Sequence, residues 1–228
     1  MMQKRALNRG ELRKSLAFVF LPAILLSVAM MSSAQARKHC STMKRLQWER
    51  SGHGIHPLGA IFERPFEPDE FLDSESFPLR VHWQNEIFFD EAPLVLSALE
   101  DAWRNQVVEM GFPEPISDGE AGGGVDRLDV YLLGLGQGAV AITLVDDDLD
   151  PVDGRENGPS HIQLDATQPT YLENVHHEFQ HVLQFSMDRR ETLMFMEATA
   201  VYQEALAFPE SAQWGELVPD FQEYPQAP

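Results

Sequence analysis

The pattern of apolar and polar positions predicts that strands and helices alternate over the C-terminal two thirds of this 228-residue chain. Short apolar runs, of the length typical of strands, occupy residues 77–83, 127–135 and 139–145. Longer apolar patterns that are typical of helices with a buried face occupy residues 90–110, 171–187 and 193–206. This mixture favours an α+β fold with a small sheet.

The last two of these helices have marked ends. Thr170 followed by Glu173 forms a capping box, which pairs the free amides at the start of a helix. Neither proline nor glycine interrupts residues 171–187. The final helix should end at Phe208, because a residue that precedes proline, here Pro209, disfavours the α conformation.

The helix 171–187 carries the motif H-E-x-x-H, spelled by His177-Glu178-Phe179-Gln180-His181. Residues i and i+4 of a helix lie on one face with Cβ atoms roughly 5–6 Å apart. His177 and His181 can therefore reach one zinc ion at Zn–N distances of about 2.0–2.1 Å. Glu178 lies about 100° further round the helix, where it can take a proton from a zinc-activated water. The same five-residue pattern also occurs by chance in proteins that bind no metal.

Catalytic zinc usually has three protein ligands and one open position. Glu197, sixteen residues after His181 and within the helix 193–206, is the best candidate for the third ligand. Glu204 follows two turns later on the same face, where it can accept a hydrogen bond from the second ring nitrogen of a ligand histidine. The alternative for Glu204 is an ordinary solvated position on the helix.

The run H-E-F-Q-H, followed by F-M-E-A-T-A-V-Y-Q-E, resembles the gluzincin metallopeptidases. More narrowly, it resembles a family of secreted bacterial metalloproteases that have H-E-F-x-H followed by E-A-T-A. A weaker similarity covers about residues 78–228. It includes the segments A-L-E-D-A-W at 98–103, D-R-L-D-V-Y at 126–131 and H-I-Q-L-D at 161–165.

The resemblance implies a zincin-like fold, in which a small mixed or antiparallel sheet packs on the active-site helix and a second helix carries the third ligand. It assigns the zinc ion to His177, His181 and Glu197, and the roles of general base and acid to Glu178. It also implies that an extended peptide substrate lies along an edge strand formed by Ile162, Gln163, Leu164 and Asp165, by strand addition.

Tyr202 is a candidate to stabilise an oxyanion with its hydroxyl group, and an aromatic contact between helices is the alternative. Members of the family usually continue with further helices after the third ligand. Because 31 residues follow Glu197 here, we expect the catalytic domain to be truncated at its C-terminal end.

Residues 1–36 have the features of a secretory signal peptide. Five basic residues precede the apolar stretch Leu16–Met31, and Ala34-Gln35-Ala36 supplies an A-x-A cleavage site. The apolar stretch is shorter than the about 20 residues of a membrane-spanning helix, and an uncleaved anchor is the alternative. We therefore predict a secreted protein, extracellular or periplasmic. Its regions are a signal peptide at 1–36, an irregular leader or pro-segment at 37–76 and a metallopeptidase-like catalytic domain at 77–228.

Outside residues 1–36 the chain has 12 Lys and Arg against 35 Asp and Glu, a net charge of −23. So acidic a surface repels nucleic acid and anionic membranes. We expect a polypeptide substrate, no nucleic-acid partner and no stable membrane association after signal cleavage. Cys40 is the only cysteine, which excludes an intramolecular disulfide.

One loop is dense in carboxylates, which are the ligands that calcium prefers. Pro151 stands where an EF-hand loop requires glycine, so a solvated charged loop is the favoured interpretation and a Ca²⁺ site the alternative. The loop contains Asp146, Asp147, Asp148, Asp150 and Asp153.

These patterns favour a secreted endopeptidase that hydrolyses peptide bonds with one catalytic Zn²⁺. The intact general base Glu178 supports it. The main alternative is a catalytically degenerate zincin-fold module that binds peptides or a partner, which the short C-terminal end favours. A structural secreted domain with a chance motif is the third. The sequence does not indicate an oligomeric state.

Overall fold

The computed structural model describes residues 42, 46, 51, 64–65, 70–135, 140–146, 156–168 and 171–210. The predicted signal peptide, the capping residue Thr170 and residues 211–228 lie outside this part of the chain.

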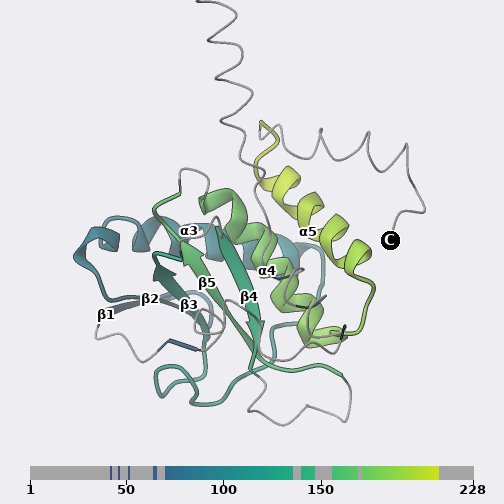
Figure 1. Ribbon diagram of the computed structural model, residues 1–228, viewed down its shortest axis with the longest axis horizontal. Coiled ribbons are helices and arrows are strands. Elements are labelled where there is room, and N and C mark those ends of the chain that lie inside the picture. Colours follow the sequence, from purple (N-terminus) through teal and green to yellow (C-terminus); the bar gives the residue numbers. More distant parts are fainter. Residues whose placement is uncertain are drawn as a thin grey trace, which may run out of the picture. The chain divides into compact units, whose positions relative to one another are not determined.

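The described residues contain one five-stranded open sheet of mixed direction. Its strand order is β1-β2-β3-β5-β4. The three central strands β2, β3 and β5 run parallel, and β1 and β4 pair antiparallel at the two edges (Figure 1). The strands are β1 (Glu70–Asp73), β2 (Leu79–Trp83), β3 (Leu128–Leu133), β4 (Ala141–Val145) and β5 (Ser160–Asp165).

Three α-helices accompany the sheet in the described residues, and the mixed α+β class is confirmed. They are α3 (Ala92–Trp103), α4 (Tyr171–Met187) and α5 (Leu193–Ala207). A short 3₁₀ turn, η2 (Glu86–Phe88), precedes α3, and a wider helical segment, η3 (Arg104–Glu109), continues it. Gly111, with φ +77°, takes the left-handed conformation that ends this helical run.

The alternation of side chains along the strands creates the core. One face of the sheet presents apolar residues to α3 and α4, because successive strand residues point to opposite faces. Aliphatic residues such as Val81, Val130 and Leu164 pack there against Leu99 and Phe179 of the helices. Each such side chain contributes about 1.5–3 kcal/mol when fully buried. The helix α4 is thereby fixed along β4 and β5.

The helix α4 is more deeply buried than an apolar stripe predicts. Every residue from Asn174 to Ser186 is buried. The sheet and α3 cover one side of α4, and α5 lies along another (Figure 1). Phe185, on the side away from the main core, packs with Met196 of α5 and with Leu46 of the leader. The side chains of the H-E-x-x-H motif therefore lie in an almost closed environment.

Two expectations are corrected. The strand formed by Ile162 to Asp165 is not an edge, because β5 lies between β3 and β4. The edge strand beside α4 is β4. The strand β1 also lies within the leader that we expected to be irregular at 37–76. It is four residues long and forms a hairpin with β2, so it carries too little periodicity to be recognised.

The helices α4 and α5 agree closely with the apolar patterns that predicted them. The segment expected at 171–187 is α4, and the helix expected to end at Phe208 has this residue as its C-cap. In the described part of the chain, none of the helices has the length and hydropathy needed to span a bilayer.

Candidate metal centre

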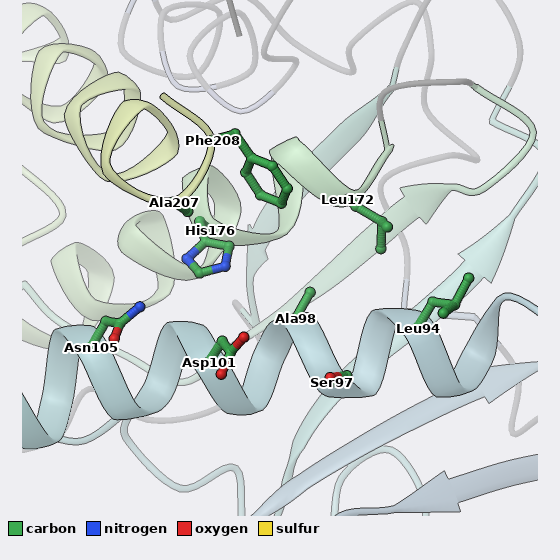
Figure 2. A pocket seen from close by; sticks show the side chains of 9 residues that line it. All are labelled: Leu94, Ser97, Ala98, Asp101, Asn105, Leu172, His176, Ala207 and Phe208. Carbon is green, nitrogen blue, oxygen red and sulfur yellow. The ribbon is translucent and has the colours of Figure 1, made fainter. Parts of the chain in front are cut away.

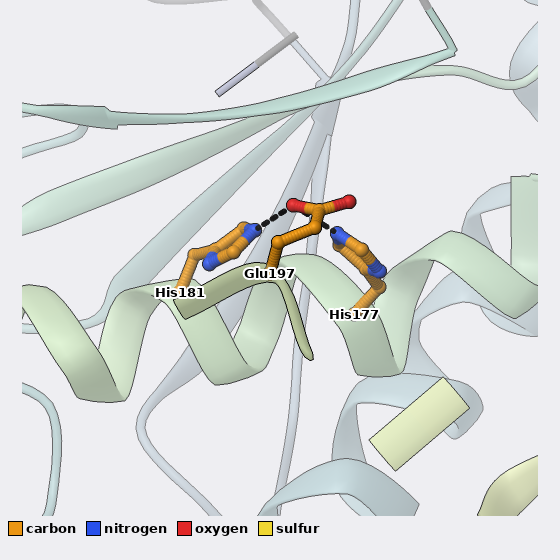
Figure 3. Close-up of side chains that lie close together, drawn as sticks. All are labelled: His177, His181 and Glu197. Carbon is orange, nitrogen blue, oxygen red and sulfur yellow. Dashed lines mark ion pairs between the residues drawn. The ribbon is translucent and has the colours of Figure 1, made fainter. Parts of the chain in front are cut away.

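The helices α4 and α5 bring His177, His181 and Glu197 together. The Oε2 atom of Glu197 lies 3.6 Å from Nε2 of His177 and 3.6 Å from Nε2 of His181. One potential ligand atom of each residue lies within 4.8 Å of the others. Figure 3 shows the two imidazoles, one helical turn apart, on either side of the carboxylate. These three side chains can hold a metal ion.

The geometry and the donor atoms fit zinc. Ligand atoms about 2.0–2.2 Å from a tetrahedral zinc ion lie roughly 3.3–3.5 Å from one another. The nitrogen–oxygen separations of 3.6 Å are slightly larger, so small side-chain rotations would bring the ligands to bonding distance. Two imidazoles and one carboxylate form a known catalytic zinc set that leaves the fourth position open.

The group is closed on the α4 side and open on the α5 side. The side chains of His177 and His181 are 4 % and 0 % exposed, whereas that of Glu197 is 34 % exposed. Burial alone would raise the pKa of Glu197, but the two imidazoles, His177 first, hold it well below its usual range. The carboxylate is therefore ionised, as a metal ligand must be.

The side chain of Glu178 is fully buried and points to the edge strand β4. Its Oε2 atom accepts a hydrogen bond from Thr143 Oγ1 at 2.7 Å and another from Thr42 Oγ1 at 2.8 Å. The Thr42 hydroxyl in turn accepts the main-chain N–H of Thr143 at 2.8 Å. Threonines of β4 and of the leader therefore hold the carboxylate that we expected to act as the general base.

The two α5 residues predicted to assist the site occupy different positions. Glu204 is 9 % exposed in its side chain, and its Oε2 lies 3.5 Å from Nδ1 of His177. The structure thus places it beside a predicted ligand. Tyr202 is 58 % exposed and, five residues after Glu197, lies about 140° round the helix from it. Its role at an oxyanion stays a prediction.

Three polar residues at the site were missed by sequence reasoning. Gln184 lies three residues after His181, and its Oε1 is 2.7 Å from Nδ1 of that histidine. This helical spacing is a signal that could have identified it. Thr143 stands in an otherwise apolar strand, which marks it as a polar exception on a buried face. Thr42 is 136 residues from Glu178 in sequence, and no local pattern predicts its contact.

His176, the neighbour of the motif, faces a separate hollow of about 340 Å³ between α3 and the C-terminal end of α5. Its ring packs edge-on against Phe208, and Asp101 and Leu172 also line the hollow (Figure 2). Burial lowers the pKa of His176 to about 4, so the ring is neutral at physiological pH. His177 and His181 do not line this hollow, so it is distinct from the group formed by His177, His181 and Glu197.

A second group of titratable side chains lies on the sheet face opposite α3 and α4. The guanidinium of Arg64 is held between three carboxylates, with 2.6 Å to Asp118, 2.6 Å to Asp129 and 2.5 Å to Asp146. Gly122, with φ +83°, allows the close approach, because a Cβ atom there would lie 1.8 Å from Nη1 of Arg64. Strand residues complete the cluster: His82, Tyr131 and His161.

The cluster predicts a specific pH dependence of stability. Burial raises the pKa of Asp118 from 3.8 to about 7, and Asp129 and Asp146 add to the rise, although Arg64 opposes it. Between about pH 4 and 7 the folded chain keeps a proton that the unfolded chain releases. The contribution of Asp118 to stability is therefore full below this window and falls as the pH rises through it.

Replacing Asp118 with asparagine should remove this pH dependence. We expect the variant to match the original protein near pH 4 and to unfold about 2–4 °C higher at pH 8, the scale expected for a domain of this length. Thermal unfolding followed by circular dichroism measures this difference, with the exposed Asp126→Asn as the control. If the thermal midpoints of Asp118→Asn and the original protein differ by the same amount at pH 4 and at pH 8, the prediction is contradicted.

The calcium interpretation of the acidic loop concerns residues that lie mostly outside the described part of the chain. Asp146 is the described member. Its carboxylate binds Arg64, and its Oδ1 atom lies 2.9 Å from Nδ1 of His161. Arginine and histidine thus occupy the positions where a cation would contact this carboxylate.

Comparisons with protein-family models, with curated proteins and with solved structures found no match to this chain. The assignment of function therefore depends on the geometry of the group formed by His177, His181 and Glu197.

Proposed function

We propose that this protein is a zinc-dependent peptidase. The observation that carries the proposal is the convergence of His177, His181 and Glu197, with both imidazole Nε2 atoms 3.6 Å from one carboxylate oxygen. These residues lie on two different helices, and tertiary packing brings them together. If the motif had arisen by chance, Glu197 of α5 would have no reason to lie beside the two histidines of α4. Zinc is proposed because this donor set is one that catalytic zinc uses.

Zinc in such a site acts as a Lewis acid and makes a water molecule acidic enough to lose a proton near neutral pH. His177, His181 and Glu197 would hold the ion. Glu178 would take the proton of the attacking water and deliver it to the leaving nitrogen of the peptide. The hydroxyl of Thr143, at 2.7 Å, orients the Glu178 carboxylate for this transfer.

The position of β4 supports a peptide as the substrate. It is an edge strand, and it packs along α4, the helix that carries the motif. An extended peptide can add to such an edge through main-chain hydrogen bonds. A mixed sheet with an antiparallel edge beside the active-site helix is also consistent with the zincin-like fold that we propose. Secretion through residues 1–36 is part of the same proposal.

A non-catalytic peptide-binding module is the second candidate. The observation that favours it is the environment of Glu178, which is fully buried and already accepts two hydroxyl hydrogen bonds at one oxygen. The two hydroxyl groups compete with any proton that this carboxylate oxygen would have to accept from a water molecule. In this alternative the zinc group and the β4 edge bind a peptide without cleaving it.

Metal analysis together with a casein assay distinguishes the two candidates. We expect one equivalent of zinc per chain and casein hydrolysis that stops when a chelator removes the zinc. One equivalent of zinc without hydrolysis would favour the binding module. Failure to bind zinc at micromolar concentrations would overturn both.

A further inference from the structure

We propose that Gln184 is a positioning residue that fixes the tautomer of His181 and sets the place of Glu197 relative to it. The inference rests on the proposed zinc site and deepens it. Gln184 lies on α4 and is 4 % exposed. Its side-chain amide contacts His181 on one end and the first turns of α5 on the other.

The orientation of the Gln184 amide follows from its partners on α5. The main-chain oxygen of Met196, 3.0 Å away, can only accept a hydrogen bond. The hydroxyl of Thr199, 2.6 Å away, donates its proton to the carbonyl of Phe195 or Met196 and so accepts from Gln184. Both contacts require the nitrogen of the amide to face α5.

The oxygen of the Gln184 amide consequently faces His181. It lies 2.7 Å from Nδ1 of that ring and can only accept, so Nδ1 carries the proton. Whenever the ring is neutral, its lone pair is therefore on Nε2, the atom that lies 3.6 Å from Glu197 and would bind a metal ion. A metal-binding histidine needs this tautomer, and a partner on the other nitrogen normally fixes it.

The same amide also positions the third ligand. Met196 immediately precedes Glu197, and Thr199 follows it by two residues. Two hydrogen bonds from Gln184 thus tie the turn of α5 that carries Glu197 to the turn of α4 that carries His181. One side chain thereby sets both the ring and the carboxylate before any metal binds.

Gln184→Met and Gln184→Glu test the inference, with zinc affinity measured by chelator competition. Methionine keeps the length but its sulfur is only a weak acceptor for Nδ1–H, and we expect zinc to bind about 10–100-fold more weakly, the usual cost of losing such a partner. Glutamate restores the acceptor and should return most of the affinity. It cannot donate to Met196, so the thermal midpoint should stay lowered.

Gln106→Met is the matched control. Gln106 is also buried, and its Nε2 donates to the main-chain oxygen of His176 on α4 at 3.1 Å, without touching a ligand ring. We expect it to reduce stability and leave zinc affinity unchanged. An equal loss of zinc affinity in both methionine variants would overturn the inference, as would unchanged affinity in Gln184→Met. If the original protein binds no zinc, the proposed function itself fails.

A second readout needs no metal. Long-range ¹H–¹⁵N correlation on the metal-free protein identifies the protonated ring nitrogen of His181. We expect Nδ1–H in the original protein and a mixture of tautomers in Gln184→Met. An Nε2–H tautomer in the original protein would overturn the inference, whatever the zinc affinity.

A different observation supports a second inference, which also rests on the proposed function. We propose that the leader inhibits the site through Thr42 and Leu46. Thr42 is 1 % exposed, and its hydroxyl donates to Glu178 and accepts the N–H of Thr143. This N–H belongs to the edge strand β4, where a substrate backbone would bind. The Thr42 hydroxyl is thus hydrogen-bonded both to the carboxylate of the proposed base, Glu178, and to a main-chain N–H at the edge of the sheet.

Leu46 strengthens this placement. It is 8 % exposed and packs with Phe185 and Met196, the residue before Glu197. Thr42 and Leu46 are four residues apart, so in a helical conformation they share one face. That face rests on α4, α5 and β4 together, where a peptide substrate would need to lie.

Thr42→Val tests the inhibition, because valine keeps the volume and loses the hydrogen bonds. We expect casein hydrolysis to rise roughly tenfold or more, on the scale of one hydrogen bond to a charged group. The amide of Thr143 should also exchange its hydrogen faster. The exposed Ser51→Ala is the control. If the original protein hydrolyses casein, unchanged or lower hydrolysis by the variant at full zinc occupancy would overturn the inference, whereas the absence of zinc or of hydrolysis in both proteins would overturn the proposed function.

Discussion

Replacing Glu178 with glutamine is expected to remove nearly all peptide hydrolysis while zinc stays bound. A general base contributes about 10²–10⁴-fold to the rate, and an amide cannot take its place at neutral pH. The substitution preserves shape, and the amide oxygen can still accept the hydroxyls of Thr143 and Thr42. We therefore expect kcat to fall by about 10²–10⁴-fold, measured with casein or a quenched fluorescent peptide.

Glu173→Gln is the matched control, since it makes the same change in the first turn of the same helix. It should leave kcat and zinc content unchanged. Hydrolysis by Glu178→Gln at the original rate would exclude Glu178 as the base. A simultaneous loss of zinc would show that the substitution disturbed the metal-binding group rather than the proton transfer.

The helices that carry the candidate site could be predicted because their information is local. The spacing of His177 and His181 within one turn, and the uninterrupted apolar pattern around them, predicted α4 from end to end. Pro209 predicted where α5 stops, through a steric effect on the residue before it. Glu197 and Glu204 were placed on one face by helical periodicity, and both lie beside His177.

The position of each strand in the sheet could not be predicted in the same way. The strand β5 is as buried as a central strand should be, with all six residues buried. Its alternation of His161, Gln163 and Asp165 with apolar residues is nevertheless typical of a half-exposed strand. The polar side chains are buried because the Arg64 cluster lies against that face. Pairing order depends on contacts between distant residues, which periodicity does not contain.

The contacts that control the site were also hidden from sequence reasoning. Thr42 reaches Glu178 across 136 residues and Arg64 reaches Asp146 across 82. Neither residue belongs to a motif, and the leader that holds both has no clear apolar period. Only Gln184, three residues after His181, lies at a spacing from which its role could have been inferred.

Replacing Glu197 with alanine is expected to have the largest effect on metal binding. The variant keeps both imidazoles but loses the anionic donor, whose Oε2 lies 3.6 Å from each Nε2. Loss of a direct ligand should exceed the about 10–100-fold cost of losing a residue that only supports one. We expect zinc affinity to fall by more than about 100-fold and casein hydrolysis to stop at micromolar zinc.

The fold should tolerate this change, because the Glu197 side chain is 34 % exposed. The zinc affinity of Glu197→Gln should lie between those of the original protein and Glu197→Ala, since an amide oxygen is a neutral and weaker ligand than a carboxylate. The exposed Glu210→Ala, just beyond α5, is the control for a lost carboxylate and should change neither quantity. If Glu197→Ala binds zinc as tightly as the original protein, the third ligand is another group and the α5 half of the proposed centre is wrong.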